Sequence, residues 1–126
     1  MEVSVLHMEI VFHMIYKICS RQCWVEAVER GVFAGAEIDL RDGFIHFSTE
    51  HQVRETASKH FAGQDDLLLV FVEESKLGKA LKWEVSRGGD LFPHLYHELD
   101  TASVARVESL PLGPDGLHIF PSLELP

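Results

Sequence analysis

Three short stretches of this 126-residue chain carry side chains that can bind a ligand or move a proton. They are residues 43–49 (GFIHFST), 82–85 (KWEV) and 92–96 (FPHLY). Each combines a titratable side chain with apolar neighbours, a mixture that serves either an active site or a well-packed core. We therefore weigh a functional and a structural interpretation for each stretch.

Residues 43–49 are predicted to be a strand that runs into a helix, since Thr49-x-x-Gln52 has the capping-box pattern. On a strand His46 and Ser48 share one face, so both side chains can reach the same point. The free N–H groups of a helix N-terminus, with the hydroxyls of Ser48 and Thr49, favour an anion or a carbonyl oxygen. The alternative is a capped helix beside a hydrogen-bonded core histidine.

Residues 82–85 are predicted to lie on an alternating strand, with Lys82 and Glu84 on one face and Trp83 on the other. A glutamate beside a glycine-containing loop is a candidate acid, base or ligand of a ribose hydroxyl. The alternative for Glu84 is a solvated ion pair with Lys82 or Arg87.

Residues 92–96 follow that loop, and Pro93 restrains them to an extended conformation. His94 and Tyr96 then lie on one side, where Tyr96 can stack on a flat ring and His94 can bind a hydroxyl or phosphate oxygen. The alternative is a hydrophobic plug anchored by the apolar residues of the stretch. We interpret it as one wall of a ligand cleft.

Composition limits the classes of protein and of partner. The chain is 46 % apolar and 25 % charged, which is typical of one soluble globular domain. A net charge of −9 disfavours nucleic acid and anionic membranes as partners. The eight histidines show no metal-ligand spacing, so we expect no metal. Cys19 and Cys23 are predicted to be reduced, as in a cytoplasmic protein.

The surrounding elements predict a single α+β domain with a mixed or mostly antiparallel sheet. Residues 1–13 are predicted to be an N-terminal extension, and residues 14–126 the domain, with an irregular tail from about residue 111. We expect strands over residues 14–19, 43–48, 66–72, 80–85 and 103–110. Residues 66–72 are almost all apolar, so this strand should be central, whereas residues 103–110 should form an edge.

Two early helices are expected between these strands. One is capped by Ser20 and ends at Gly31, and the other follows Thr49 and ends at Gly63. Residues 35–42 are predicted to be a loop.

The order of these motifs resembles a known family. IYKI near the start, the Glu-Arg-Gly31 helix end, DGFIHFST, KWE and LFPHLY are similar to a small bacterial family catalogued as domain of unknown function 952. The resemblance covers about residues 14–110. That family is grouped with the ADP-ribosyltransferase-like superfamily, whose members bind NAD in a cleft of a split sheet. The resemblance therefore implies a split-sheet fold and NAD as a possible cofactor.

The resemblance also implies roles for single residues. Glu84 matches the late glutamate that orients the ribose and stabilises an oxocarbenium-like transition state. His46 is similar to the second-strand residues near the nicotinamide. Glu84 and His46 are therefore the candidate catalytic residues. Lys17 stands where those enzymes have a first-strand His or Arg. The candidate cofactor-binding residues are Lys17, Ser48, Thr49, Trp83, His94 and Tyr96, with Tyr96 or Trp83 stacking on nicotinamide.

Two kinds of function remain open from the sequence. The first is a nucleotide- or NAD-binding enzyme that transfers or hydrolyses at a glycosidic bond. The second is a non-catalytic domain, which either binds a small ligand in the same cleft or serves a structural or interaction role.

Overall fold

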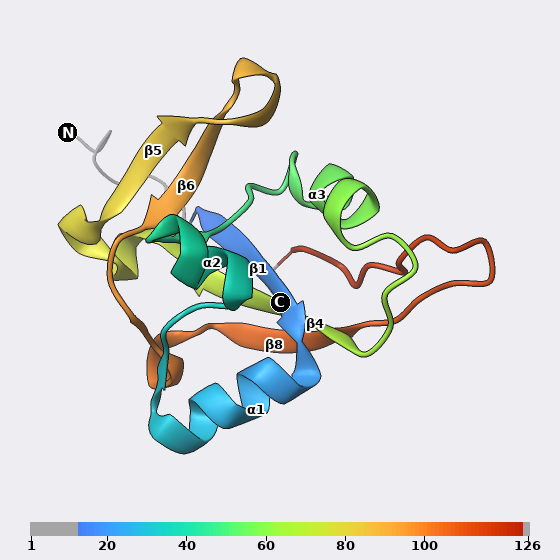
Figure 1. Cartoon of the computed structure of the whole chain (residues 1–126), viewed down its shortest axis with the longest axis horizontal. Helices are drawn as coiled ribbons and strands as arrows, with labels where there is room; N and C mark the ends of the chain where they lie inside the picture. The colour runs from blue at the N-terminus through green and yellow to red at the C-terminus, as the bar shows by residue number, and fades with distance from the viewer. Residues whose placement is uncertain (1–12, 125–126) are drawn as a thin grey trace, which may run out of the picture.

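The computed structural model describes residues 13–124, except for the side chain of Arg87. Apart from His13, the expected extension over residues 1–13 lies outside this part. The described chain is an α+β domain with antiparallel sheets and few helices (Figure 1). None of the helices in this part is long and apolar enough to cross a membrane.

The first sheet has the strand order β1-β4-β8. The central strand β4 (Leu67–Glu73) pairs antiparallel with β1 (Met14–Ser20) and β8 (Arg106–Leu110). Residues 67–72 are all buried, which confirms the predicted central strand. The predicted edge strand is also confirmed, but β8 starts three residues late because Thr101–Ser103 form a 3₁₀ turn capped by the Asp100 side chain.

The second sheet has the strand order β3-β6-β5, in which β6 (Leu91–Leu95) lies between β3 (Ile45–His46) and β5 (Leu81–Val85). The FPHLY stretch is therefore largely a middle strand. Proline cannot donate to a ladder, and the Pro93 carbonyl only accepts from the Phe47 N–H, at 3.0 Å. The missing donor explains why β3 ends after two residue pairs.

Within residues 13–124, one backbone bridge joins the two sheets. Tyr16 N–H donates to the Ser48 carbonyl at 2.8 Å, and Ser48 N–H donates to the Tyr16 carbonyl at 2.9 Å. Figure 1 shows β5 and β6 of the second sheet projecting away from β1, β4 and β8 of the first. A short pair, β2 (Val32–Phe33) with β7 (Leu99–Asp100), completes the strands of the described part.

Helix α1 (Arg21–Arg30) forms as predicted. The Ser20 hydroxyl accepts from Cys23 N–H at 3.1 Å, and the helix ends at Gly31 in the left-handed conformation, with φ of 85°. Burial raises the pKa of the Cys19 thiol to about 12, so it stays protonated, and Cys23 is likewise a free thiol.

One expectation about helices is wrong, and another is confirmed with different bounds. Residues 37–42 are not loop but helix α2 (Glu37–Asp42), which is too short to be stable alone and depends on tertiary contacts of Asp39. Helix α3 (Val53–His60) confirms the helix expected after Thr49, but it begins four residues after Thr49 and ends at His60 and not at Gly63. Only half of the capping box forms, since the Gln52 side chain accepts from Thr49 N–H at 3.0 Å while the chain continues through a turn.

Apolar clusters cover both faces of the first sheet. Residues of even number in β4 pack on one side with α1, and those of odd number pack on the other side with α3. Residues 111–124 form no helix or strand beyond one bridge between Leu112 and His118. This tail packs against the second cluster through Leu123, whose carbonyl accepts from the Tyr16 hydroxyl at 3.4 Å.

The packing of β6 gives a first prediction. Phe92 is buried, whereas its neighbour Leu91 is half exposed. We expect Phe92→Ala to lower the free energy of unfolding by about 3–5 kcal/mol, because it leaves a cavity, and Leu91→Ala to lower it by less than about 1 kcal/mol. Urea unfolding measures both, and equal losses would contradict the assignment of Phe92 to the core.

Candidate functional site

A buried ion pair connects β1 and α2. Lys17 from β1 and Asp39 from α2 are both almost completely buried, and the ammonium nitrogen lies 2.8 and 2.7 Å from the two carboxylate oxygens. Oδ2 of Asp39 also accepts from Ala36 N–H at 2.7 Å, and Oδ1 accepts from His46 N–H at 3.0 Å. Asp39 thus connects β1, α2 and β3.

These donors set the charge state of Asp39. Burial on its own would raise the pKa, but the hydrogen bond from His46, the positive charge and hydrogen bond of Lys17, and Ala36 N–H outweigh it. The net effect lowers the pKa of Asp39 from its usual 3.8 to about 2. A Cβ at Gly35 would lie 2.7 Å from the Asp39 Cβ, so the loop before α2 closes tightly over this carboxylate.

His46 bridges two carboxylates. Its Nδ1 lies 2.7 Å from Asp39 Oδ1, and its Nε2 lies 3.0 Å from Asp42 Oδ2. When both carboxylates are ionised, both contacts are hydrogen bonds only if each ring nitrogen carries a proton. Asp42 is also paired with Arg41, at 3.2 Å. Both ring nitrogens of His46 are therefore occupied, which suits a positioning role.

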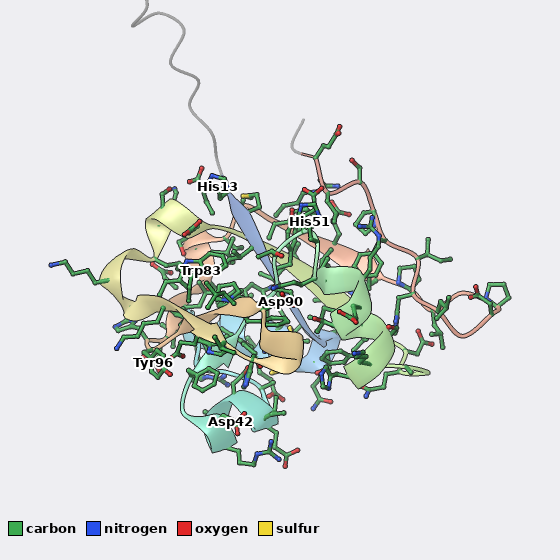
Figure 2. All side chains as sticks on the ribbon, turned by 90° about the horizontal axis from the view of Figure 1, so that it is seen from above. His13, Asp42, His51, Trp83, Asp90 and Tyr96 are labelled. Carbon is green, nitrogen blue, oxygen red and sulfur yellow. The ribbon has the colours of Figure 1, made fainter. Side chains whose placement is uncertain are left out.

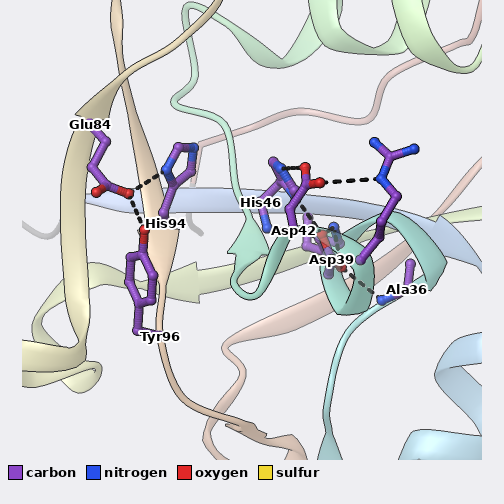
Figure 3. Close-up of polar contacts among 9 residues, drawn as sticks. Ala36, Asp39, Asp42, His46, Glu84, His94 and Tyr96 are labelled. Carbon is purple, nitrogen blue, oxygen red and sulfur yellow. Dashed lines mark hydrogen bonds and ion pairs between the residues drawn. The ribbon is translucent and has the colours of Figure 1, made fainter.

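A second polar group surrounds Glu84 on the neighbouring strands. Glu84 Oε1 accepts from the Tyr96 hydroxyl at 2.7 Å and lies 2.8 Å from Nδ1 of His94 (Figure 3). The His94 side chain is buried, whereas the Glu84 side chain is 40 % exposed. This group combines a fixed carboxylate with access to solvent.

Electrostatics keep Glu84 ionised. The hydrogen bonds from Tyr96 and His94, followed by electrostatic interactions with His94 and Lys82, lower the pKa of Glu84 despite some desolvation. The same hydrogen bond to Glu84 raises the pKa of Tyr96, so its hydroxyl remains a donor. Glu84 is consequently suited to stabilise positive charge and not to donate a proton at neutral pH.

Aromatic rings connect the two polar groups. Phe44 stacks on His94 with centroids 4.1 Å apart and an interplanar angle of 30°, and it lies 4.5 Å from His46 and 5.2 Å from Tyr96. The two histidine rings are 5.5 Å apart because His46 and His94 are paired across β3 and β6. We call Phe44, His46, Glu84, His94 and Tyr96 the Glu84 surface.

The structure brings four of the predicted site residues together, namely His46, Glu84, His94 and Tyr96. Trp83 lies on the opposite face of β5, where its indole N–H donates to Glu74 at 3.1 Å. In Figure 2, Asp42 and Tyr96 lie toward the same edge of the molecule and Trp83 lies farther from it. Stacking by Trp83 on a ligand bound to the Glu84 surface is therefore not supported by its position.

Lys17, Ser48 and Thr49 also lie apart from the Glu84 surface. The Lys17 ammonium forms an ion pair with Asp39 in the protein interior. The Ser48 backbone pairs with Tyr16, its hydroxyl is 2.9 Å from that of Thr56, and Thr49 N–H is held by Gln52. The expected anion site at a helix N-terminus therefore does not form at Ser48–Thr49, since these N–H groups are already bonded.

Sequence reasoning missed three residues of the site, which are Asp39, Asp42 and Phe44. The first two stand on the helix taken for a loop. The Gly43 that follows is left-handed with φ of 88°, and a glycine after Glu37–Asp42 is the signal that predicts a helix end there. Within residues 13–124, no group of three or more His, Cys, Asp or Glu side chains could hold a metal ion.

Comparison with known proteins places the chain in a family. Residues 18–107 match the family described as protein of unknown function (DUF952), and the chain belongs to this family. No match was found among the curated proteins.

Solved structures of one relative are similar to the chain. The crystal structure of protein CC0527 from Caulobacter crescentus is 50 % identical and has a TM-score of 0.82 over 84 % of this chain and 93 % of that one. The solution NMR structure of CC0527 is 51 % identical, with a TM-score of 0.75 over 82 % and 90 %.

The buried ion pair gives a second prediction. In Asp39→Asn the Lys17 ammonium stays buried without its counter-charge, so we expect a loss of about 3–5 kcal/mol in the free energy of unfolding. Lys17→Met in the same background should recover part of this loss. Urea unfolding of the two single variants and the double variant measures the coupling, and strictly additive losses would contradict an interaction between these side chains.

The lowered pKa of Asp39 gives a third prediction, on pH. A carboxyl whose pKa falls on folding stabilises the fold above its unfolded pKa, near 3.8, and loses this contribution as pH falls toward its folded pKa of about 2. We expect the difference in unfolding free energy between wild type and Asp39→Asn to shrink by about 2 kcal/mol over this window. Parallel profiles of the two proteins would contradict it.

Proposed function

We propose that the Glu84 surface binds a small nucleotide-like molecule, such as NAD, and acts on its glycosidic bond. The observation that carries the proposal is an ionised, partly exposed Glu84 carboxylate, fixed by His94 and Tyr96 beside an aromatic cluster. Such a carboxylate next to ring faces suits a ligand that has both a flat base and a sugar carbon able to develop positive charge.

The proposed reaction follows from the charge of Glu84. As the bond between ribose C1 and the nitrogen of a cationic base breaks, its electron pair leaves with the base, and positive charge develops on C1 and the ring oxygen. An ionised carboxylate stabilises that charge. Water or an acceptor hydroxyl then forms the new bond to C1 and gives up its proton to solvent, which makes the reaction hydrolysis or transfer.

Other residues support binding in this proposal. The Tyr96 ring is exposed, and with Phe44 it offers a face for the base. The Lys82 ammonium, 5.2 Å from the centre of the Tyr96 ring, can neutralise a phosphate. His46 does not take the role of a base, because both of its ring nitrogens face carboxylates; it positions Phe44 and β3 instead.

A second candidate function is binding without catalysis. The observation that favours it is the sequestration of Lys17, the first-strand cation, by Asp39 in the interior. A ligand at the Glu84 surface would then lack the first-strand cation that the superfamily resemblance leads one to expect. Such a protein would bind a nucleotide and leave it unchanged.

A titration of the isotopically labelled protein with NAD, ADP-ribose and nicotinamide, followed by NMR, tests the proposal. We expect saturable shifts at the Glu84 surface and release of nicotinamide from NAD in the same sample. Glu84→Gln should keep the fold and lower product formation at least about a hundredfold. Glu29→Gln, on the exposed side of α1, is the matched control and should change neither.

The outcomes separate the candidates. Saturable shifts without product favour the non-catalytic binder. The absence of shifts at millimolar ligand contradicts the nucleotide proposal and leaves a structural or interaction role.

A further inference from the structure

Strand β5 presents an unused edge in the described part of the chain. It is the outer strand of the order β3-β6-β5, and it projects from the body of the molecule with β6 (Figure 1). Val85 and Leu91, paired at its end, are 68 % and 52 % exposed, and Trp83 is 38 % exposed. A long edge with exposed apolar residues is a template for pairing with another strand.

The hydrogen-bond pattern shows which residues of β5 face outward. Tyr96 N–H donates to the Ala80 carbonyl, and Ser86 N–H donates to the Asp90 carbonyl, at either end of the β5–β6 pairing. Hydrogen-bonded pairs alternate along an antiparallel ladder, so the even-numbered residues of β5 bond to β6. The N–H and C=O groups of Leu81, Trp83 and Val85 therefore point away from β6. The Leu81 N–H already donates to the Gly78 carbonyl, so Leu81 offers its carbonyl to a further strand.

We propose that β5 pairs with β5 of a second copy of this chain in an antiparallel, two-fold symmetric dimer. In the register that places Trp83 opposite Trp83 of the second copy, Leu81 lies opposite Val85, and all of these are outward-facing residues. The two Trp83 residues exchange backbone hydrogen bonds across the axis. Each Val85 N–H donates to the Leu81 carbonyl of the other copy, whereas the Leu81 N–H keeps its bond to the Gly78 carbonyl. The result is a continuous sheet that runs from β3 of one copy to β3 of the other.

Charge selects this register. Lys82 lies opposite Glu84 of the second copy, and Glu84 lies opposite its Lys82. These are non-hydrogen-bonded pairs, whose side chains approach most closely. A shift of the axis to Lys82 would place two lysines opposite each other, and a shift to Glu84 would place two glutamates opposite each other. Both shifted registers keep the outward residues paired but are disfavoured by like charges.

The second copy also adds to the Glu84 surface. Lys82 and Glu84 lie on the same face as His94 and Tyr96, and both hydrogen bonds of Glu84 use its Oε1 atom. Lys82 of the second copy can therefore approach Oε2 and bring a cation to the surface. On the opposite face, Trp83 and Val85 lose exposed apolar area. The dimer does not depend on the proposed ligand, since its contacts are those of β5 alone.

Sedimentation equilibrium of the full 126-residue chain, over micromolar to millimolar concentrations, tests this dimer. We expect a monomer–dimer equilibrium in the wild type. Lys82→Glu turns both attractive pairs into repulsive ones and should raise the dissociation constant at least about tenfold. Glu84→Lys should do the same, and the double reversal Lys82→Glu with Glu84→Lys should return it to within about threefold of wild type, because opposite charges face each other again.

A variant of the backbone tests the hydrogen bonds between the two β5 strands separately from the charges of Lys82 and Glu84. Val85→Pro deletes one outward N–H without touching a donor to β6, so it should weaken the dimer and leave the monomer folded. Val85→Thr is its matched control, since it keeps the N–H, and should dimerise as the wild type does. A chain that stays monomeric throughout, a dimer insensitive to Val85→Pro, or a double reversal no tighter than the single ones would each overturn the proposal.

Discussion

The buried Lys17–Asp39 ion pair is the constraint on which the rest of the site depends. Two charges removed from water are tolerated only when their remaining hydrogen-bonding capacity is satisfied. Asp39 meets this condition because it bonds to Lys17, to the Ala36 N–H, and to both the backbone N–H and the ring Nδ1 of His46. That requirement fixes α2 against β1 and β3. It also holds His46 in place, and through His46 it orients the aromatic ring of Phe44.

Burial gives two similar polar groups different roles. Asp39 and Glu84 each accept hydrogen bonds from a histidine and from further donors, and the pKa of each carboxyl is lowered. Asp39 is closed off from solvent and connects elements of the fold, whereas Glu84 is open and can meet a ligand. The stacked rings of Phe44 and His94 separate the two carboxylates, so the inner group supports the geometry of the outer one.

Local patterns predicted much of the fold. The apolar run of β4 identified a strand because a strand buried on both faces is apolar at every position. The alternation in β5 identified another because a strand buried on one face is apolar at every second position. Ser20 and Gly31 identified α1 because caps are local. Helix α2 was missed because its six residues cannot form a stable helix alone, and their conformation depends on a carboxylate that bonds to residues outside it. The late start of α3 has a similar cause, since Ser48 is held by the bridge to Tyr16.

The sequence by itself determined that Glu84 shares a strand face with Lys82 and that His94 shares one with Tyr96, because side chains alternate with a period of two. Only the tertiary structure decided that these two strands lie side by side, so that one carboxylate meets both partners. It also decided that Lys17 is buried against Asp39, 22 residues away. The hydrophobic period of a strand indicates which of its faces is buried. It does not indicate which side chain of a distant segment lies next to that face. The partner of a charged side chain such as Lys17 is set by its distance in the folded structure, and not by its distance along the sequence.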